Sequence, residues 1–329
     1  MTKKEGGLSS YLFFASKIII AYLCNVFASK MVKNVFICFL LFTASACAVL
    51  TKSQLNLVTN LTVASDSVAS TPAAMFDKLA TIRTERGLYY AASLSSASAH
   101  EKEMNALAKS SYEDEQLVSR MNVYVNVLNS YLRALRSMSA DTRWKSYGTE
   151  WRGLGRNVDS LILRINQTAL LDTKITVGWA KLSGQYMGYI SENYMRIRQA
   201  KTVKTFVTEG DTLVAACVDG LVELLKKGEI VALIENESEG LKSNYAAYLQ
   251  HLELTGKMTS ISEDRRYVEL YKQLEAVKKT HSRCITALQS LKRAHNKLVK
   301  ELEKKRKVEY MYEELLTLNA LALQLQKML

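Results

Sequence analysis

The stretch that decides the fold is Leu270-Tyr-Lys-Gln-Leu274-Glu-Ala-Val277-Lys-Lys-Thr-His281-Ser-Arg-Cys284-Ile-Thr-Ala-Leu288-Gln-Ser-Leu291-Lys-Arg-Ala-His295-Asn-Lys-Leu298-Val-Lys-Glu-Leu302. The numbered positions alternate steps of four and three residues, which is the heptad spacing of a helix packed along one side. Just before it, Ser260-Ile-Ser-Glu263 has the form of a capping box and marks a helix start. The pattern predicts one helix over residues 267–302, about 54 Å long at 1.5 Å per residue.

The same spacing resumes after the basic run Lys304-Lys-Arg-Lys307, shifted by one residue. A shift of this kind requires a kink or a new helix that packs on a different partner. Residues 257–329 are therefore expected to form a basic, heptad-patterned antiparallel coiled-coil arm, which either folds back onto the rest of the chain or reaches a partner. The resumed positions are Val308, Met311, Leu315, Leu318, Ala322, Leu325 and Leu329.

The preceding residues, 71–256, also have helical periodicity and few helix breakers. The whole chain has one proline and 14 glycines, too few for the turns of a β-sandwich or barrel. An all-α class follows, with an elongated up-and-down bundle over 71–256. The bundle's apolar positions recur at three and four residues. They include Met121, Tyr124, Leu128, Tyr131, Leu135, Met138, Trp144, Trp151, Trp179, Leu182 and Tyr186.

Local signals predict where these helices begin and end. Thr71-Pro72 marks a start, because proline fits the first helical position. Residues 91–99 are rich in Ala and Ser and predict a tight helix crossing or, alternatively, a flexible loop. Gly210-Asp-Thr212 indicates a stop and a new cap, and Lys226-Lys-Gly228 ends the helix that follows. Residues 230–256 are expected to be helical, although Ile230 to Ile234 has the composition of a strand.

The amino-terminal region contains a signal of a different kind. Met31-Val-Lys-Asn-Val-Phe-Ile-Cys-Phe-Leu-Leu-Phe-Thr-Ala-Ser-Ala-Cys47 has a positive start, an apolar centre and small residues before a cysteine. Ala44-Ser45-Ala46-Cys47 resembles the lipobox of bacterial lipoproteins. The resemblance implies cleavage before Cys47 and acylation of that residue. The alternatives are a short transmembrane helix with a chance cysteine, or an ordinary signal peptide cut nearby.

The lipobox divides the amino-terminal region into three expected segments. Residues 1–30 are interpreted as an extension upstream of the true start, with a membrane-entering helical hairpin of residues 11–28 and 34–50 as the competing interpretation. Residues 31–46 are the expected signal peptide. Residues 47–70 are the expected lipidated cysteine and tether, with a helix as the alternative for the later part, where Leu57, Leu61, Ala64 and Val68 recur at three and four residues. Because Ala48 and not Asp follows the cysteine, resemblance to lipoprotein sorting implies the outer membrane, with the protein facing the periplasm.

The chain has a formal net charge of +12, and much of the excess lies in the arm. Residues 257–310 contain fifteen Lys and Arg against seven Asp and Glu. A basic helix face suits an acidic partner, anionic lipid or nucleic acid, although many such faces are only solvated. An exported lipoprotein rarely meets nucleic acid, so no nucleic-acid partner is expected. The expected partners are the membrane, through the lipid anchor, and either envelope proteins or a second copy of the chain through helix self-association. The candidate partner-binding residues are Arg283, Lys292, Arg293, Lys297, Lys300, Lys304, Lys305, Arg306 and Lys307.

Cysteine and histidine residues on the helical seam raise two further questions. Cys217 and Cys284 could form a disulfide or remain as two buried thiols. His281, Cys284 and His295 lie on one seam, yet they lack a fourth ligand and the short paired spacings of a metal site. No phosphate-binding loop, nucleophile elbow or metalloprotease motif occurs in the sequence. We therefore expect no enzyme activity, no metal and no cofactor.

Two functions remain. The first is a structural or assembly component of a cell-envelope complex. Lipoprotein subunits of secretion systems, including the type VI apparatus of Bacteroides-like bacteria, resemble this general build. The second is a ligand-binding sensor bundle, with a pocket around Trp144, Trp151 and Trp179. Glu85-Arg86-Gly87, followed by Leu88-Tyr89-Tyr90, is similar to the helical start of nitrate-sensing bundles.

Overall fold

A computed structural model describes residues 52–139, 192–303 and 312–328, with a few helical residues between 156 and 166. Every secondary-structure element that these ranges contain is a helix, which confirms the all-α class. The expected leader, Cys47, the three tryptophans and Lys304 to Lys307 lie outside the described residues. The helices are α2 (Lys52–Ser93), α3 (Ala97–Ser139), α6 (Glu192–Lys226), α7 (Gly228–Leu254), α8 (Ile261–Glu303) and α9 (Tyr312–Gln326).

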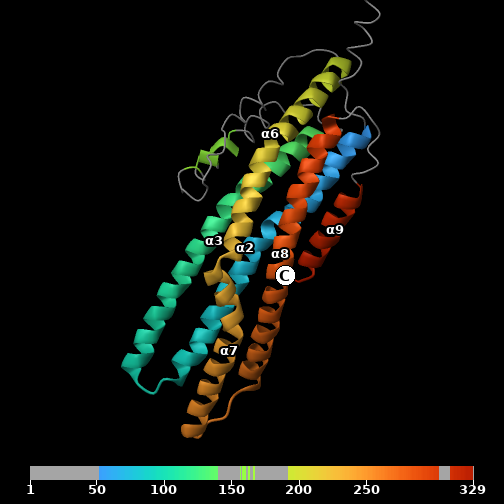
Figure 1. Cartoon of the computed structure of the whole chain (residues 1–329). Helices are drawn as coiled ribbons and strands as arrows, with labels where there is room; N and C mark the ends of the chain where they lie inside the picture. Colours follow the sequence, from blue (N-terminus) through green and yellow to red (C-terminus); the bar gives the residue numbers. More distant parts are fainter. Residues whose placement is uncertain are drawn as a thin grey trace, which may run out of the picture. The chain divides into compact units, whose positions relative to one another are not determined.

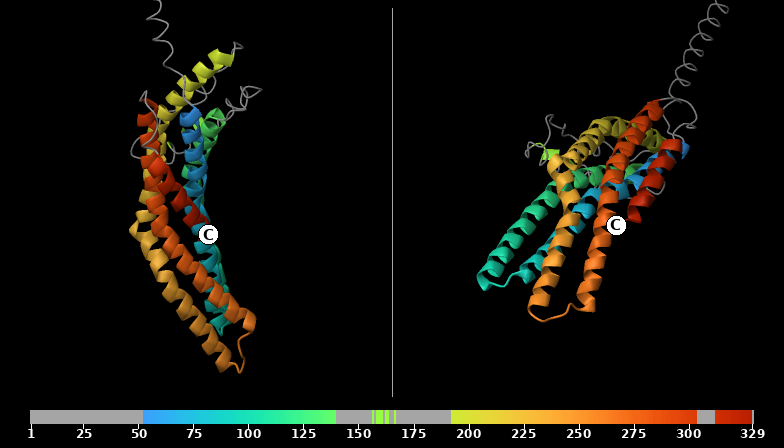
Figure 2. Two further views of the ribbon diagram at one scale, coloured as in Figure 1. Left: turned by 90° about the vertical axis from the view of Figure 1, so that its right-hand side faces the viewer. Right: turned by 60° about the horizontal axis from the view of Figure 1, so that its bottom comes forward.

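These helices run up and down along one bundle (Figure 1). α2 and α3 form an antiparallel pair, α6 and α7 follow one another in the same direction, and α8 returns beside both. α2 packs against α3, α7, α8 and α9, while α6 packs against α3, α7 and α8. The α2–α3 and α7–α8 turns lie at the same end of the bundle (Figure 2). The observed arrangement is the predicted up-and-down bundle.

α2 begins much earlier than the sequence suggested. The expected tether over residues 48–70 is helical from Lys52 onward, and Pro72 lies inside the helix and not at its start. Leu57, Leu61 and Val68 are almost completely buried. Proline in a helix interior removes one backbone hydrogen bond and costs about 3 kcal/mol. Burying each of these side chains contributes roughly 1.5–3 kcal/mol, so together they offset the break.

The turn between α2 and α3 is short. Of the two alternatives for residues 91–99, the loop is observed, because α2 ends at Ser93 and α3 begins at Ala97. The backbone N–H of Ala99 donates to Ser96 Oγ at 3.4 Å, so this serine caps the new helix. The carbonyl of Ala91 is 2.8 Å from Nδ1 of His100, which ties the two helix ends together.

The predicted break at Gly210 is wrong. α6 continues through it from Glu192 to Lys226. A Cβ added at Gly210 would lie only 2.2 Å from the hydroxyl oxygen of Tyr131 and 2.4 Å from two of its ring carbons. The glycine is therefore explained by the close approach of a neighbouring helix and not by a turn.

The later helix boundaries agree with the sequence. α6 ends at Lys226 and α7 covers Gly228–Leu254, so Ile230 to Ile234 is helical as predicted. Gly256 follows α7 with a φ of +68°, a value that L side chains rarely adopt. The N–H of Glu263 donates to Ser260 Oγ at 3.2 Å, which confirms Ser260 as the cap of α8.

The predicted arm folds back onto the bundle. α8 contacts α2, α6 and α7 along its length, and α9 packs against α2 and α8. Residues Leu50–Leu329 form one compact unit, so the expected boundary at 256/257 falls in a turn inside it. The seam positions of α8 are buried, apart from the partly exposed His281. Cys217 and Cys284 are both free and buried, which is the second of the two alternatives for this pair.

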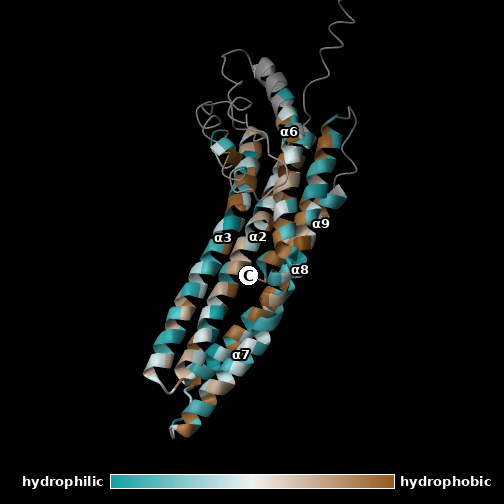
Figure 3. Ribbon diagram, turned by 60° about the vertical axis from the view of Figure 1, so that its left-hand side comes forward, coloured by the Kyte–Doolittle hydropathy of each residue, from teal (hydrophilic) through white to brown (hydrophobic). Residues whose placement is uncertain are grey.

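Apolar residues recur turn by turn along the helices (Figure 3). They form one connected core, with Tyr124, Tyr131 and Phe206 among its largest fully buried side chains. None of the helices in the described ranges combines the length and the continuous apolar character needed to cross a bilayer.

Candidate anion-binding pocket

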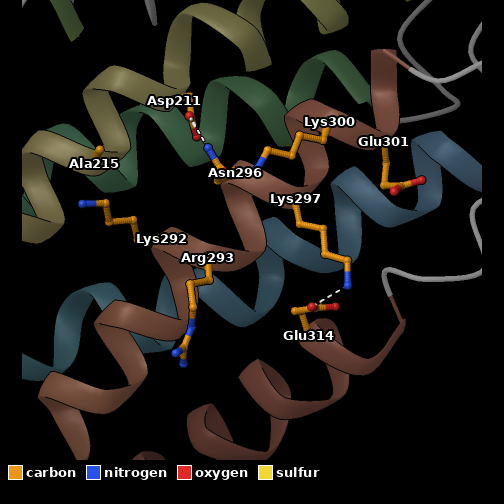
Figure 4. A pocket seen from close by; sticks show the side chains of 9 residues that line it. All are labelled: Asp211, Ala215, Lys292, Arg293, Asn296, Lys297, Lys300, Glu301 and Glu314. Carbon is orange, nitrogen blue, oxygen red and sulfur yellow. Dashed lines mark hydrogen bonds and ion pairs between the residues drawn. The ribbon is translucent and has the colours of Figure 1, made fainter.

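An open cavity of about 560 Å³ lies along α8, with α6 on one side and α9 on the other (Figure 4). Most of its lining comes from α8, while α6 and α9 contribute its other walls. Four of the lining side chains are cationic and three are carboxylates. The lining residues are Asp211, Ala215, Lys292, Arg293, Asn296, Lys297, Lys300, Glu301 and Glu314.

The spacing of the cations follows from the geometry of α8. Arg293, Lys297 and Lys300 are separated by four and three residues, so they share one face of the helix. The apolar seam of α8 points into the core and includes the fully buried Leu291 and Leu298. Burying the seam therefore leaves the basic residues at the surface, where they surround the cavity.

Two of the four cations already have carboxylate partners. Lys292 Nζ lies 2.6 Å from an oxygen of Asp219, and Lys297 Nζ lies 2.5 Å from Glu314 Oε1. Arg293 and Lys300 are exposed and form no ion pair with any residue that the structure describes. The cavity therefore has two cationic groups that an incoming anion can contact without breaking a bond within the protein.

The pair between Lys297 and Glu314 also fixes α9 against α8. Partial burial is the largest single influence and raises the pKa of Glu314, but the hydrogen bond and charge of Lys297, a backbone hydrogen bond and the nearby Arg293 charge together outweigh it. The net pKa is below the ordinary value, so this carboxylate is ionised at neutral pH. The negative charge of Glu314 at the rim repels anionic groups. An anionic ligand must therefore place its charge on the α8 side of the cavity, where the cations lie.

Behind the cavity wall, a buried polar chain joins three helices. Tyr131 of α3 and His295 of α8 are both 0% exposed, and the tyrosine oxygen lies 2.7 Å from His295 Nε2. His295 Nδ1 lies 3.0 Å from Asp211 of α6. Asn296 Nδ2 donates to the other carboxylate oxygen of Asp211 at 2.9 Å. The Tyr131 ring is stacked on Phe206, with ring centroids 5.3 Å apart.

The proton positions in this chain follow from its chemistry. The hydrogen bond from His295 lowers the pKa of Asp211 despite its partial burial, so the carboxylate is ionised and can only accept. Nδ1 of His295 must then donate to it, and in the neutral ring Nε2 accepts the hydroxyl proton of Tyr131. Burial raises the pKa of Tyr131 well above its usual value. The chain is therefore a fully paired connection between α3, α6 and α8.

The hydroxyl of this polar chain is not accessible to a substrate. Tyr131 is the hydroxyl next to the histidine, and it is sealed in the core where no substrate can reach it. Within the ranges that the structure describes, no group of three His, Cys, Asp or Glu side chains could hold a metal ion. His281 instead contacts the carbonyl of Leu225, with Nε2 at 2.8 Å from that oxygen.

The structure brings together four of the predicted partner-binding residues and separates one. Lys292, Arg293, Lys297 and Lys300 all line the cavity. Arg283 lies elsewhere on α8, where its guanidinium is 3.4 Å from the sulfur of Met328. Asp211, Asn296 and Glu314 were not predicted from the sequence, although a histidine on an apolar seam was a signal that a buried polar partner must exist.

The Glu85-Arg86-Gly87 motif belongs to a second charged cluster, between α2, α3 and α7. Arg86 Nε and Arg83 Nε lie 3.1 and 3.3 Å from the buried Glu237, and Arg83 also pairs with Asp114. Glu85 pairs with Arg266 at 2.7 Å. Every charge of this cluster has an opposite charge within the chain, which leaves no unpaired cation there for an anionic ligand.

Comparison with known proteins identifies no relative. No family model matches the chain, and neither a curated protein nor a solved structure is detectably similar to it.

Proposed function

We propose that this protein is a lipid-anchored, periplasm-facing helical lipoprotein that works by binding. In this proposal the cavity between α6, α8 and α9 holds an acidic segment of another envelope protein. The protein then acts as a structural or assembly component of a cell-envelope complex, such as a secretion system.

The pocket is the observation that carries the binding half of the proposal. Arg293 and Lys300 are exposed and without ion pairs in the described residues, and they flank one cavity. A guanidinium forms two parallel hydrogen bonds with a carboxylate, which favours Asp or Glu side chains as ligands. An extended acidic peptide could follow the α8 face from one cation to the next. The described lining of the pocket contains no serine, threonine, cysteine or histidine, so the binding interpretation rests on its charges.

The anchor is the other half of the proposal, and it rests on the sequence around Cys47. Cleavage before this residue and full acylation would attach three fatty chains to the new amino terminus. A single acyl chain holds a protein to a membrane only marginally, whereas two or more hold it stably. Anchoring would keep the basic pocket close to partners in the same membrane.

Charge reversal in the pocket tests the binding role. The variant Arg293→Glu/Lys300→Glu should lose crosslinking to an envelope protein in affinity purification from native cells, because two acceptor cations become repulsive. The matched control is Lys102→Glu/Lys109→Glu, which reverses two exposed lysines on α3. Equal capture of the same envelope proteins by both variants would contradict the binding role, as would the capture of none by the native chain.

Metabolic labelling tests the anchor separately. Cells given a palmitate analogue should yield a labelled native protein and an unlabelled Cys47→Ser variant, which should also leave the membrane fraction. A native protein without label would refute the lipoprotein assignment while leaving the pocket experiment unaffected.

A further inference from the structure

α9 has a second apolar stripe on the side that faces away from the bundle. Its inner seam, which includes Leu315 and Leu318, is buried against α2 and α8. On the opposite side, Leu316 is 66% exposed and Leu323 is 58% exposed. Ala320 lies between them and is also exposed. Among the described residues, this helix buries its inner apolar side and leaves its outer apolar side exposed.

Charged residues of opposite sign continue this outer stripe at its two ends. Glu313 precedes Leu316 by three residues and Lys327 follows Leu323 by four, so the five positions keep the heptad alternation of three and four. The N–H of Lys327 still donates to the carbonyl of Leu323 at 3.3 Å, so the helical geometry reaches the last position. Both charged side chains are exposed and form no ion pair among the residues that the structure describes.

We propose that this outer stripe of α9 is a homodimer interface, in which it packs antiparallel against the same stripe of a second copy. Glu313 and Lys327 each lie seven residues from Ala320. A two-fold axis through Ala320 therefore places the Glu313 of each copy beside the Lys327 of the other. Leu316 and Leu323 meet across the same axis. The small Ala320 side chain at the centre lets the two helices approach closely.

The charges select both the direction and the size of the assembly. A parallel pair would set Glu313 against Glu313 and Lys327 against Lys327, which repels at both ends. An antiparallel pair converts these into two attractive contacts. An interface that is its own complement closes as a dimer and leaves no free stripe for a third copy.

The position of α9 leaves its outer side accessible to a second copy. α9 lies at the edge of the bundle, and the left view of Figure 2 shows it in front of the other helices. The helix has only 15 residues. The interface is therefore at the small end for specific contacts, and association is expected to be weak and concentration-dependent.

Sedimentation velocity of the full chain in a mild detergent tests the proposal. The native protein should shift from monomer to dimer as its concentration rises, because contacts of this small size associate weakly. Leu316→Glu and Leu323→Glu should each weaken this association by about tenfold or more, because each buries a charge in the paired stripe. Leu249→Glu changes an exposed leucine on α7 and should leave it unchanged.

Charge reversal distinguishes this interface from any other. Glu313→Lys alone and Lys327→Glu alone should each weaken the dimer, and the double variant should restore it because opposite charges face each other again. Circular dichroism confirms that each variant remains helical. A native chain that is monomeric throughout would overturn the proposal. A dimer that is insensitive to the stripe variants, or a double variant that is not restored, would overturn it equally.

Discussion

Replacing Tyr131 with phenylalanine tests the buried polar chain directly. The change removes one hydroxyl group and keeps the ring, so the stacking on Phe206 is preserved. It leaves Nε2 of His295 without the donor that lies 2.7 Å away. His295 is fully buried, so water cannot supply the missing proton. The variant should therefore lose the stability that the hydroxyl contributes by hydrogen bonding, while the packing of the ring is kept.

The size of the effect follows from the cost of an unsatisfied buried group. Leaving a buried acceptor unpaired costs about 1–3 kcal/mol. A domain of this size loses roughly 2–4 °C in melting temperature per kcal/mol, so the variant should melt roughly 2–12 °C lower. The free energy of unfolding from urea titration, followed by far-UV circular dichroism, gives the same quantity without heating.

The matched control is Tyr112→Phe on α3. Tyr112 is 61% exposed, and its hydroxyl has no hydrogen bond within the part of the chain that the structure describes. Its replacement should change stability by no more than about 0.5 kcal/mol. If Tyr131→Phe is equally neutral, then the His295 ring does not depend on this hydroxyl, and the assigned proton positions are wrong.

Three further predictions concern the same core. Gly210→Ala should destabilise the fold by about 1–3 kcal/mol through overpacking, while Gly228→Ala, with nothing within 4 Å of the added carbon, should be neutral or slightly stabilising in urea titrations. The folded pKa of Asp211 lies below 3.8, so the ionised carboxylate stabilises the fold above that pH. Asp211→Asn should therefore be less stable than the native protein above pH 3.8, and the difference in unfolding free energy should vanish as the pH falls through the folded pKa. Burial raises the pKa of Cys217 and Cys284 to about 12, so peptide mapping should find both thiols unalkylated at pH 8 until the chain unfolds. Equal alkylation rates in the folded and unfolded protein would contradict their burial.

Local periodicity was enough to predict α8 and its seam. The heptads of α8 and the capping box at Ser260 depend only on residues a few positions apart, and both agree with the structure. The basic face of α8 was predictable for the same reason. Its four cavity-lining cations share one helix, so their spacing alone places them together.

Features that depend on distant residues could not be predicted in this way. Gly210 suggested a helix stop, and only the ring of Tyr131, from another helix, explains it. Pro72 suggested a helix start. The helix begins earlier because the residues before Pro72 are buried, and that burial is a property of the packed bundle. The partners of His295 come from α3 and α6, and the hydrogen bond to Tyr131 spans 164 positions of sequence. Asp211 and Glu314 could not be predicted as pocket residues either, because they come from α6 and α9 and not from α8.

The central position of α2 also has a consequence for how the chain is made. Its apolar side is covered in part by α9, and Gln326 donates a hydrogen bond to Ser67, 259 residues earlier. At roughly 5–20 residues per second of translation, that side waits roughly 10–50 seconds for its last partner to be synthesised. The part of the apolar surface that α9 covers therefore stays exposed on the nascent chain until α9 is synthesised, and a chain that ends before residue 312 leaves it exposed.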